Sequence, residues 1–140
     1  MCIERVESSS QIRLTFEVGT ALPLHRGAGP KLLLAHLPPA ECETVLDEAA
    51  ARDPSLAPQR EMLQRELAVI RQQGWAESRA EITPHVYAAS VGVCDANGVV
   101  AAISFVAPAF RMPKAGQIKL RECLQQAAVD INRAYAAVTF

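Results

Sequence analysis

The chain has 140 residues, half of them hydrophobic, and a formal net charge of −1. This composition excludes a disordered chain, because a sequence of this length and hydrophobicity can bury a substantial core. Residues 1–70 carry seven basic and ten acidic side chains, and residues 71–140 carry seven and five. Neither half has the basic excess of a nucleic-acid-binding protein, so we do not expect this chain by itself to bind DNA specifically.

The sequence contains no membrane-spanning segment. Its longest uncharged run is 15 residues long, at positions 96–110, and Asn97, Gly98 and Pro108 interrupt it. A membrane-spanning helix needs about 20 apolar residues. The first residues also lack the basic-then-apolar pattern of a signal peptide. The sequence therefore predicts a cytoplasmic protein with no membrane partner.

No motif for a metal, a cofactor or catalysis is present. The spacing of the cysteines fits neither a zinc site nor a redox pair, which favours small buried or half-buried apolar residues, and the histidines share no ligand spacing. Nucleophile elbows, phosphate-binding glycine loops and paired carboxylates are also missing, so we expect no enzyme. The residues concerned are Cys2, Cys42, Cys94, Cys123, His25, His36 and His85.

In chain order, the pattern predicts a strand and then three helices. Apolar residues alternate from position 12 to 18, which is typical of a half-buried strand. Gly29 and Pro30 suit the N-cap and first position of a helix that Pro38 and Pro39 end, and Gly74 suits the stop of the third helix. The predicted helices cover residues 31–37, 40–51 and 58–73, and a short extended piece begins at Trp75.

A β-hairpin follows, with strands Val86–Cys94 and Val99–Val106 around a turn that contains Gly98 in a bulge. Such a turn sets Asp95 opposite Val99 and Ser90 opposite Ser104. Each strand then has one face of bulky residues, which we expect under helices, and one of small residues. The small face either leaves room for a ligand or is covered by another chain or by loops. Its members are Ala88, Ser90, Gly92, Ala102, Ser104 and Val106.

Pro113 precedes a long amphipathic helix that we expect on the sheet. Its apolar stripe consists of Leu120, Leu124, Ala127, Ile131 and Ala134. Among the polar residues, we interpret His25, followed by Arg26, as a turn residue rather than an anion clamp, His36 as a cap of helix carbonyls and His85 as a loop residue. Glu81 either orients a lid or is solvated, and the charged run Arg60, Glu61, Arg65 and Glu66 is expected on a solvated helix face.

Several segments resemble one protein family. Leu22-Pro23-Leu24-His25, then Lys31 and Leu34-Ala35, are similar to a stretch of the IclR family of bacterial transcription regulators. Further resemblances are Ile70-Arg71-Gln72-Gln73-Gly74-Trp75, the ten residues 95–104 and Ala107-Pro108-Ala109-Phe110-Arg111. The resemblance extends nearly from end to end, and the order and spacing of these segments make it fairly specific.

This resemblance implies a single domain over residues 1–140, the effector-binding domain, without counterparts of the family's first helix and strand. The implied fold is of the α/β (α+β) class, with a GAF-like antiparallel sheet flanked by helices. The implied function is to sense a small organic acid for a regulator that reaches DNA only through a winged helix-turn-helix domain, which this chain lacks. The family also implies a homo-oligomer, a dimer or tetramer. The alternative is a stand-alone GAF-like ligand-binding or oligomerisation protein.

The resemblance also implies a ligand site. In this family, main-chain N–H groups at the entry of the first helix bind the effector's carboxylate, as a helix N-terminus favours. We expect the free N–H groups of Lys31 and Leu32 to act as donors, and Pro30 removes another. Apolar residues where family members have polar ones favour an aromatic or medium-chain acid over a very small one. The implied site residues are Leu14, Leu22, Ala28, Gly29, Ser78, Val86, Ala88, Ser90, Ser104 and Val106.

Overall fold

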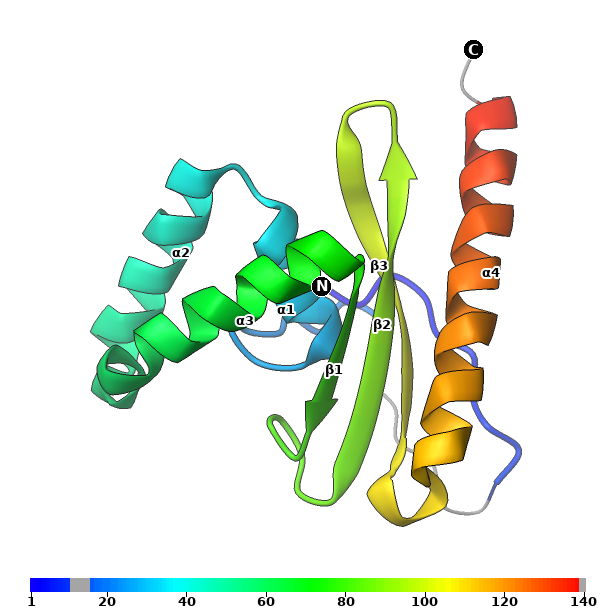
Figure 1. Ribbon diagram of the computed structural model, residues 1–140, viewed down its shortest axis with the longest axis horizontal. Coiled ribbons are helices and arrows are strands. Elements are labelled where there is room, and N and C mark those ends of the chain that lie inside the picture. Colours follow the sequence, from blue (N-terminus) through cyan, green and yellow to red (C-terminus); the bar gives the residue numbers. More distant parts are fainter. Residues whose placement is uncertain (11–15, 139–140) are drawn as a thin grey trace.

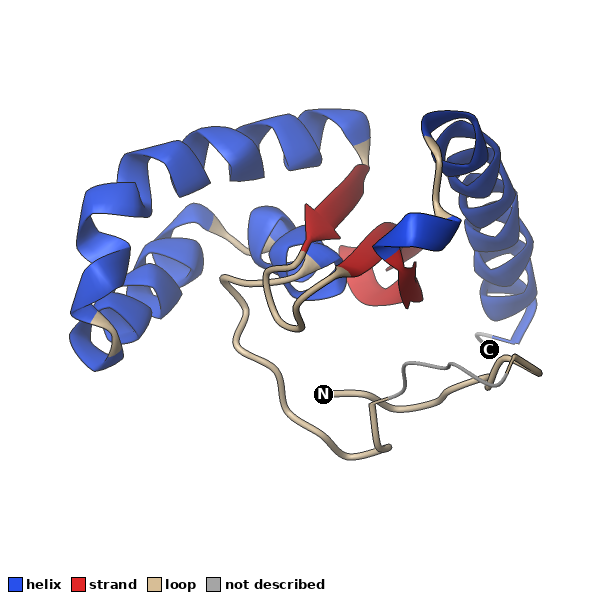
Figure 2. Ribbon diagram, turned by 90° about the horizontal axis from the view of Figure 1, so that it is seen from below, coloured by secondary structure: helices blue, strands red, loops and turns tan. Residues whose placement is uncertain are grey.

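The computed structural model describes residues 1–10 and 16–138. Three antiparallel strands, in the order β1-β2-β3, separate two layers of helices (Figures 1 and 2). Helices α1 to α3 lie on one side of the sheet and α4 on the other, which confirms the predicted α+β class. The strands are β1 (Trp75–Arg79), β2 (Val86–Asp95) and β3 (Gly98–Pro108), and the helices are α1 (Ala28–His36), α2 (Pro39–Arg52), α3 (Arg60–Gln73) and α4 (Lys114–Val138).

Helix α1 begins earlier than the sequence predicts. Its N-cap is Gly27, whose φ of 88° is a left-handed conformation that glycine adopts without strain. Pro30 is therefore the third helical residue and not the first. The helix tolerates this proline because the N–H groups of the first turn have no intrahelical acceptor.

Of the next two helices, α2 is within one residue of its predicted range at each end, and α3 begins two residues later than predicted. Pro54–Gln59 form a separate 3₁₀ turn, η1, where Asp53 Oδ1 accepts a hydrogen bond from Ser55 N at 3.0 Å. Helix α3 consequently begins at Arg60 and not at residue 58. Its end is as predicted, because Gly74 takes a left-handed conformation with φ 75°.

The hairpin register is confirmed over the body of the strands. Ser90 pairs with Ser104, and Ala88 pairs with Val106. The prediction is wrong at the turn, where Asp95 lies opposite Gly98 and not Val99. The register shifts by one residue between Val93 and Cys94, which pair with Ala101 and Val99, so the extra residue of the bulge is Val100 on β3 and not the turn glycine.

Both faces of the sheet are covered by helices. The bulky face packs against α4 as predicted over β2, with Tyr87, Ala89, Val91 and Leu124 in one buried cluster. Phe105 on the same face of β3 is 38% exposed, contrary to that prediction. The small face lies against α1, which contacts both β2 and β3. We expected this face either to leave room for a ligand or to be covered by loops or another chain. Both expectations are wrong where α1 covers the face. Small side chains allow this close approach of helix and sheet.

Helix α4 follows the predicted stripe only through its first half. Leu120 and Leu124 face the sheet, but Ala128 continues the buried face and Ile131 is 44% exposed. A polar contact follows further along the helix, where Asn132 Oδ1 accepts a hydrogen bond from Cys94 N at 2.9 Å. Cys123 on the same helix is exposed, contrary to the expectation that all four cysteines are buried or half-buried.

The N-terminal segment runs along one side of the molecule (Figure 2). Positions 12–15 of the predicted strand lie outside the described residues, and positions 16–18 are not in a strand. Strand β3 consequently has no strand neighbour on its far edge among the described residues. None of the described helices combines the length and apolar character that a membrane crossing requires.

Candidate functional site

The first turn of α1 lies directly on the small face of the hairpin. A Cβ atom at Gly29 would be 2.6 Å from Ser104 Oγ and 3.4 Å from Ser90 Oγ. The two hydroxyls are hydrogen bonded to each other at 2.7 Å. Ser90 is 1% exposed, whereas Ser104 is exposed. The sheet therefore offers one accessible hydroxyl, backed by a buried one, beside the start of a helix.

Other residues of the predicted site lie along the same face. Ser78, Ala88 and Val106 are paired across the three strands in one row, next to the row that contains Ser90 and Ser104. Ala88 and Val106 are half-buried, and Ser78 is buried. Val86 and Leu22 are also half-buried, Ala28 is buried in α1, and Leu14 lies outside the described residues. The structure thus brings Gly29, Ser90 and Ser104 into contact and places three more site residues in the adjacent row.

The hydrogen-bond donors at the start of α1 differ from the predicted ones. Lys31 N donates to Gly27 O at 3.1 Å, as the first bond of the helix, and Leu32 N lies inside the helix. The prediction that these two groups are free is therefore wrong. The N–H groups of Ala28 and Gly29 have no hydrogen-bond partner in the part of the chain that the structure describes. They are the donors of the first turn that remain for a ligand.

The third donor of this helix end is already bound. Glu81, from the loop between β1 and β2, accepts a hydrogen bond from Gly27 N at 2.8 Å through Oε2. Its other oxygen, Oε1, accepts a bond from Lys31 Nζ at 2.6 Å. Glu81 is therefore not simply solvated: its side chain is 30% exposed, but it joins the loop to α1 by two charge-assisted hydrogen bonds.

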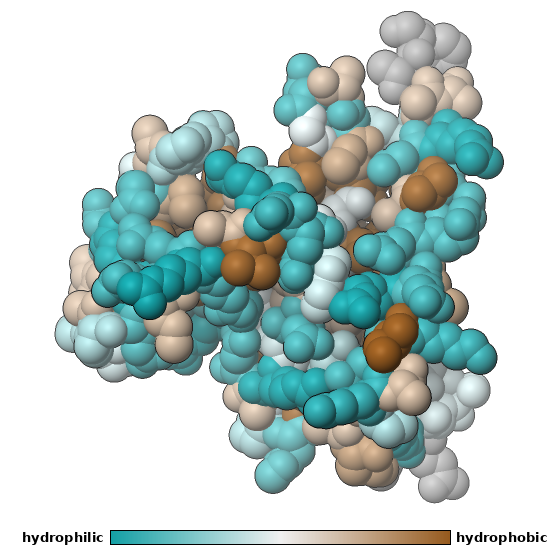
Figure 3. Space-filling view, in the orientation of Figure 1, coloured by the Kyte–Doolittle hydropathy of each residue, from teal (hydrophilic) through white to brown (hydrophobic). Residues whose placement is uncertain are grey.

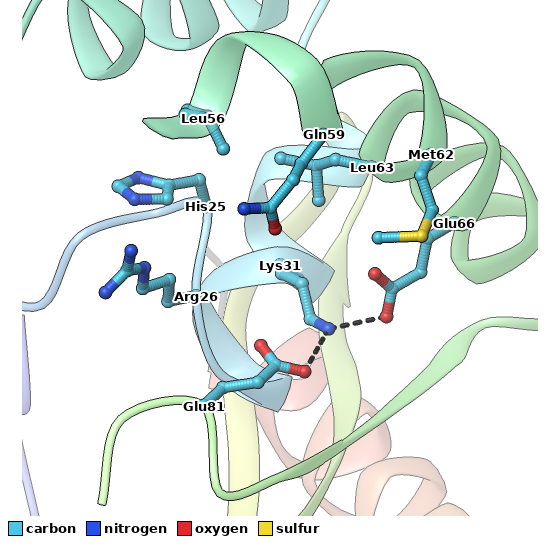
Figure 4. Close-up of a pocket in the computed structure, with 9 residues that line it drawn as sticks. All are labelled: His25, Arg26, Lys31, Leu56, Gln59, Met62, Leu63, Glu66 and Glu81. Atoms are coloured by element: carbon cyan, nitrogen blue, oxygen red, sulfur yellow. Dashed lines mark hydrogen bonds and ion pairs between the residues drawn. The ribbon is translucent and has the colours of Figure 1, made fainter. Parts of the chain in front are cut away.

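The buried side chain of Lys31 is the centre of an ionic cluster with two partly exposed carboxylates (Figure 4). Its side chain is 2% exposed, and Nζ also lies 2.5 Å from Glu66 Oε1. Glu66 keeps 42% of its side chain exposed, as expected for the charged face of α3, and in addition pairs with Lys31 of α1. The cluster is not among the features predicted from the sequence, although a lysine at the start of the apolar run Lys31-Leu32-Leu33-Leu34 is a signal for it. A lysine in that position needs carboxylate partners nearby.

A cavity of about 320 Å³ lies over this cluster, on the side of α1 away from the sheet. Arg26 is paired with Asp53 at 3.0 Å at its edge. Burial lowers the pKa of His25, and the positive charge of Arg26 lowers it further. The lining residues are His25, Arg26, Lys31, Leu56, Gln59, Met62, Leu63, Glu66 and Glu81. Its charges are already paired within the protein.

A second cavity, of about 310 Å³, lies between α1, α2 and α3 and contains Cys42. Burial raises the pKa of the Cys42 thiol, so it is not an activated nucleophile.

The predictions for His36 and His85 are confirmed. His36 Nδ1 lies 2.8 Å from the helix carbonyl of Leu32, and His85 is in an exposed loop with φ 60°. No group of three metal-ligating side chains occurs among the described residues.

The visible outer surface is mainly hydrophilic, with hydrophobic residues in separate patches (Figure 3). Large exposed apolar side chains occur on several different elements, including Val100 on β3, Phe110 after it and Ile118 on α4. None of these patches is a defined binding site. The most specific chemical feature on the sheet face is the pair of N–H donors of Ala28 and Gly29 beside Ser104. Such a group of donors at a helix N-terminus binds an anion such as a carboxylate.

Comparison with known proteins supports this description. The family model of the bacterial transcriptional regulator IclR C-terminal domain matches residues 1–133. The HTH-type transcriptional regulator XynR of Escherichia coli is 32% identical over 135 residues, which cover 94% of this chain and 54% of XynR. The chain thus spans about half the length of this curated relative.

Solved structures of similar fold include two of special interest. One is the C-terminal domain of a transcriptional regulator from Vibrio cholerae, 35% identical with a TM-score of 0.77, covering 91% of this chain and 75% of that one. The other is an IclR homolog from Microbacterium hydrocarbonoxydans complexed with 4-hydroxybenzoate, 25% identical with a TM-score of 0.77, covering 96% and 55%. With the family match over most of its length, the chain belongs to the IclR family of bacterial transcriptional regulators and corresponds to their C-terminal domain.

Proposed function

We propose that this domain senses a small organic acid, without catalysis, for an IclR-type transcription regulator. The observation that carries the proposal is the pair of N–H donors, on Ala28 and Gly29, beside the Ser104 hydroxyl. Ser90 can donate its proton to Ser104 Oγ, which leaves the Ser104 O–H for a ligand carboxylate. The 4-hydroxybenzoate complex of a protein with the same fold supports an acid of this kind.

The residues around these donors favour an apolar ligand body. Val86, Ala88 and Val106 are half-buried residues of the hairpin, and we expect them, with the half-buried Leu22, to supply apolar walls with few polar groups, the usual chemistry of a small-molecule site. An aromatic or medium-chain acid removes more apolar surface from water there than a two- or three-carbon acid. Benzoate and 4-hydroxybenzoate are therefore expected to bind more tightly than pyruvate.

The regulatory role rests on the relatives. They are HTH-type regulators about twice as long as the region that this chain matches. We infer that DNA is bound through a winged helix-turn-helix domain and not through the fold described above. A stand-alone ligand-binding or oligomerisation protein is the less favoured alternative, because the family match is to a domain of DNA-binding regulators.

Replacing Ser104 with alanine is expected to weaken binding of benzoate, measured by calorimetry. The substitution removes the hydroxyl without adding atoms against Gly29. The expected loss is about 1 kcal/mol for a neutral hydrogen bond and up to about 3 kcal/mol for a bond to a charged group.

The matched control is Thr44→Ala on α2, which removes an exposed hydroxyl that donates to Ala40 O at 2.9 Å, away from the sheet. Its affinity for benzoate should equal that of the wild type. Equal affinities of all three proteins would show that the site is elsewhere, and absence of binding to the wild type by every acid tested would reject the sensing role.

We also expect the domain to self-associate. Strand β3 has 11 residues and an edge without a strand neighbour among the described residues, and such an edge can pair with another chain. Sedimentation velocity should show a mass that rises with protein concentration or is constant at a dimer or tetramer. A monomer at all concentrations would contradict this prediction.

A further inference from the structure

Glu81 places a negative charge at the same helix end as the proposed acid site. Its carboxylate is bound to Gly27 N, the residue just before Ala28 and Gly29. Both the protein's own carboxylate and a ligand carboxylate would therefore be attracted by the same partial positive charge, of about half an elementary charge. The two anions repel each other across the first turn of α1.

The charge of Glu81 is compensated only in part by its surroundings. Lys31 is the cation in contact with it, and Lys31 is shared with Glu66, so the three groups together have a formal charge of −1. Arg26 lines the same cavity but is paired with Asp53.

The number of main-chain donors at this helix end is also small. Pro30 has no N–H, so the two donors of this turn that remain for a ligand are those of Ala28 and Gly29.

We infer that Glu81 is a specificity-determining residue, which restricts the site to ligand head groups with a single negative charge. A carboxylate has two oxygens and one charge, which match two main-chain donors and one hydroxyl. A phosphonate or phosphate head group has up to two charges and three oxygens, and its second charge is repelled by Glu81 without further donors to stabilise it. This inference rests on the proposed acid-sensing function.

The backbone conformation and contacts of the loop between β1 and β2 fix the position of Glu81. Ala80 and His85, at its two ends, have φ values of 55° and 60°, which are unfavourable for residues other than glycine. The loop is closed by a hydrogen bond from Ala80 N to Val86 O at 2.8 Å, and Ile82 packs against Gly27. These contacts hold the carboxylate at the helix end.

The test compares benzoate with phenylphosphonate, which have the same ring and different head-group charges, at about pH 8, where the phosphonate is largely a dianion. Calorimetry gives the ratio of the two affinities for the wild type and for Glu81→Gln. We expect the wild type to prefer benzoate, and Glu81→Gln to reduce that preference about fivefold or more, as expected from removing a like charge at a partly exposed site. Glutamine can still accept the hydrogen bond from Gly27.

The matched control is Glu61→Gln, which removes an exposed carboxylate of α3 that is paired with Arg65 on the same helix and not with Lys31. Its affinity ratio should stay within about twofold of the wild-type ratio, because the removed charge is exposed to solvent and screened from the helix end. The specificity role of Glu81 would be overturned, with the proposed function intact, in two cases in which benzoate binds the wild type. In one, the affinity ratio changes equally in both variants; in the other, it does not change in Glu81→Gln. Failure of benzoate to bind the wild type would overturn the proposed function as well.

Discussion

Replacing both Glu66 and Glu81 with glutamine is expected to lower the free energy of unfolding by about 3 kcal/mol. The Lys31 ammonium is 2% exposed and would then have no charged partner in its cluster. Leaving a buried charge uncompensated typically costs about 3–5 kcal/mol. We expect the lower end, because the glutamine oxygens can still accept hydrogen bonds. Urea unfolding monitored by circular dichroism provides the measurement.

The triple variant Lys31→Met/Glu66→Gln/Glu81→Gln separates the charge effect from the loss of side-chain contacts. Methionine has a length similar to that of lysine and no charge, so the desolvation cost of the ammonium disappears. Most of the lost stability should return. If the double variant is as stable as the wild type, or if the triple variant is no more stable than the double variant, the buried charge of Lys31 does not control this part of the fold.

Gly29→Ala is expected to lower the free energy of unfolding by about 1–2 kcal/mol and to abolish binding of benzoate. The new methyl group would lie 2.6 Å from Ser104 Oγ, so either the hydroxyl rotates and loses its bond to Ser90, or α1 moves away from the sheet. Overpacking of this kind typically costs about 1–3 kcal/mol, and the better helix propensity of alanine offsets part of that. The same methyl group would occupy the proposed carboxylate position.

Gly116→Ala is the matched control, since it makes the same change in helix α4. There the methyl group would meet only Pro113, at 3.5 Å and beyond, which is an ordinary contact. Stability should rise by up to about 1 kcal/mol. In the double variant Gly29→Ala/Ser104→Ala the clashing oxygen is absent, so the two effects should be less than additive. Additive effects would show that Gly29 and Ser104 are not in contact.

Local patterns determined much of this fold from the sequence alone. The alternation of residues 86–106 predicts the hairpin and the pairing over the body of its strands, because a strand has a period of two. The pairing predicted at the turn, Asp95 with Val99, is wrong. Gly74 predicts the end of α3, since glycine adopts the left-handed conformation without strain. The family, too, is apparent from the order of its motifs, and the match over residues 1–133 confirms it.

The tertiary structure decided how the start of α1 is used. No local pattern shows that Glu81 reaches Gly27, 54 residues away in sequence, or that it shares Lys31 with Glu66 from another helix. Nor does periodicity show that Gly29 contacts Ser104 of the sheet. Charge pairing and helix-to-sheet distance depend on segments far apart in sequence, and these meet only when the chain folds.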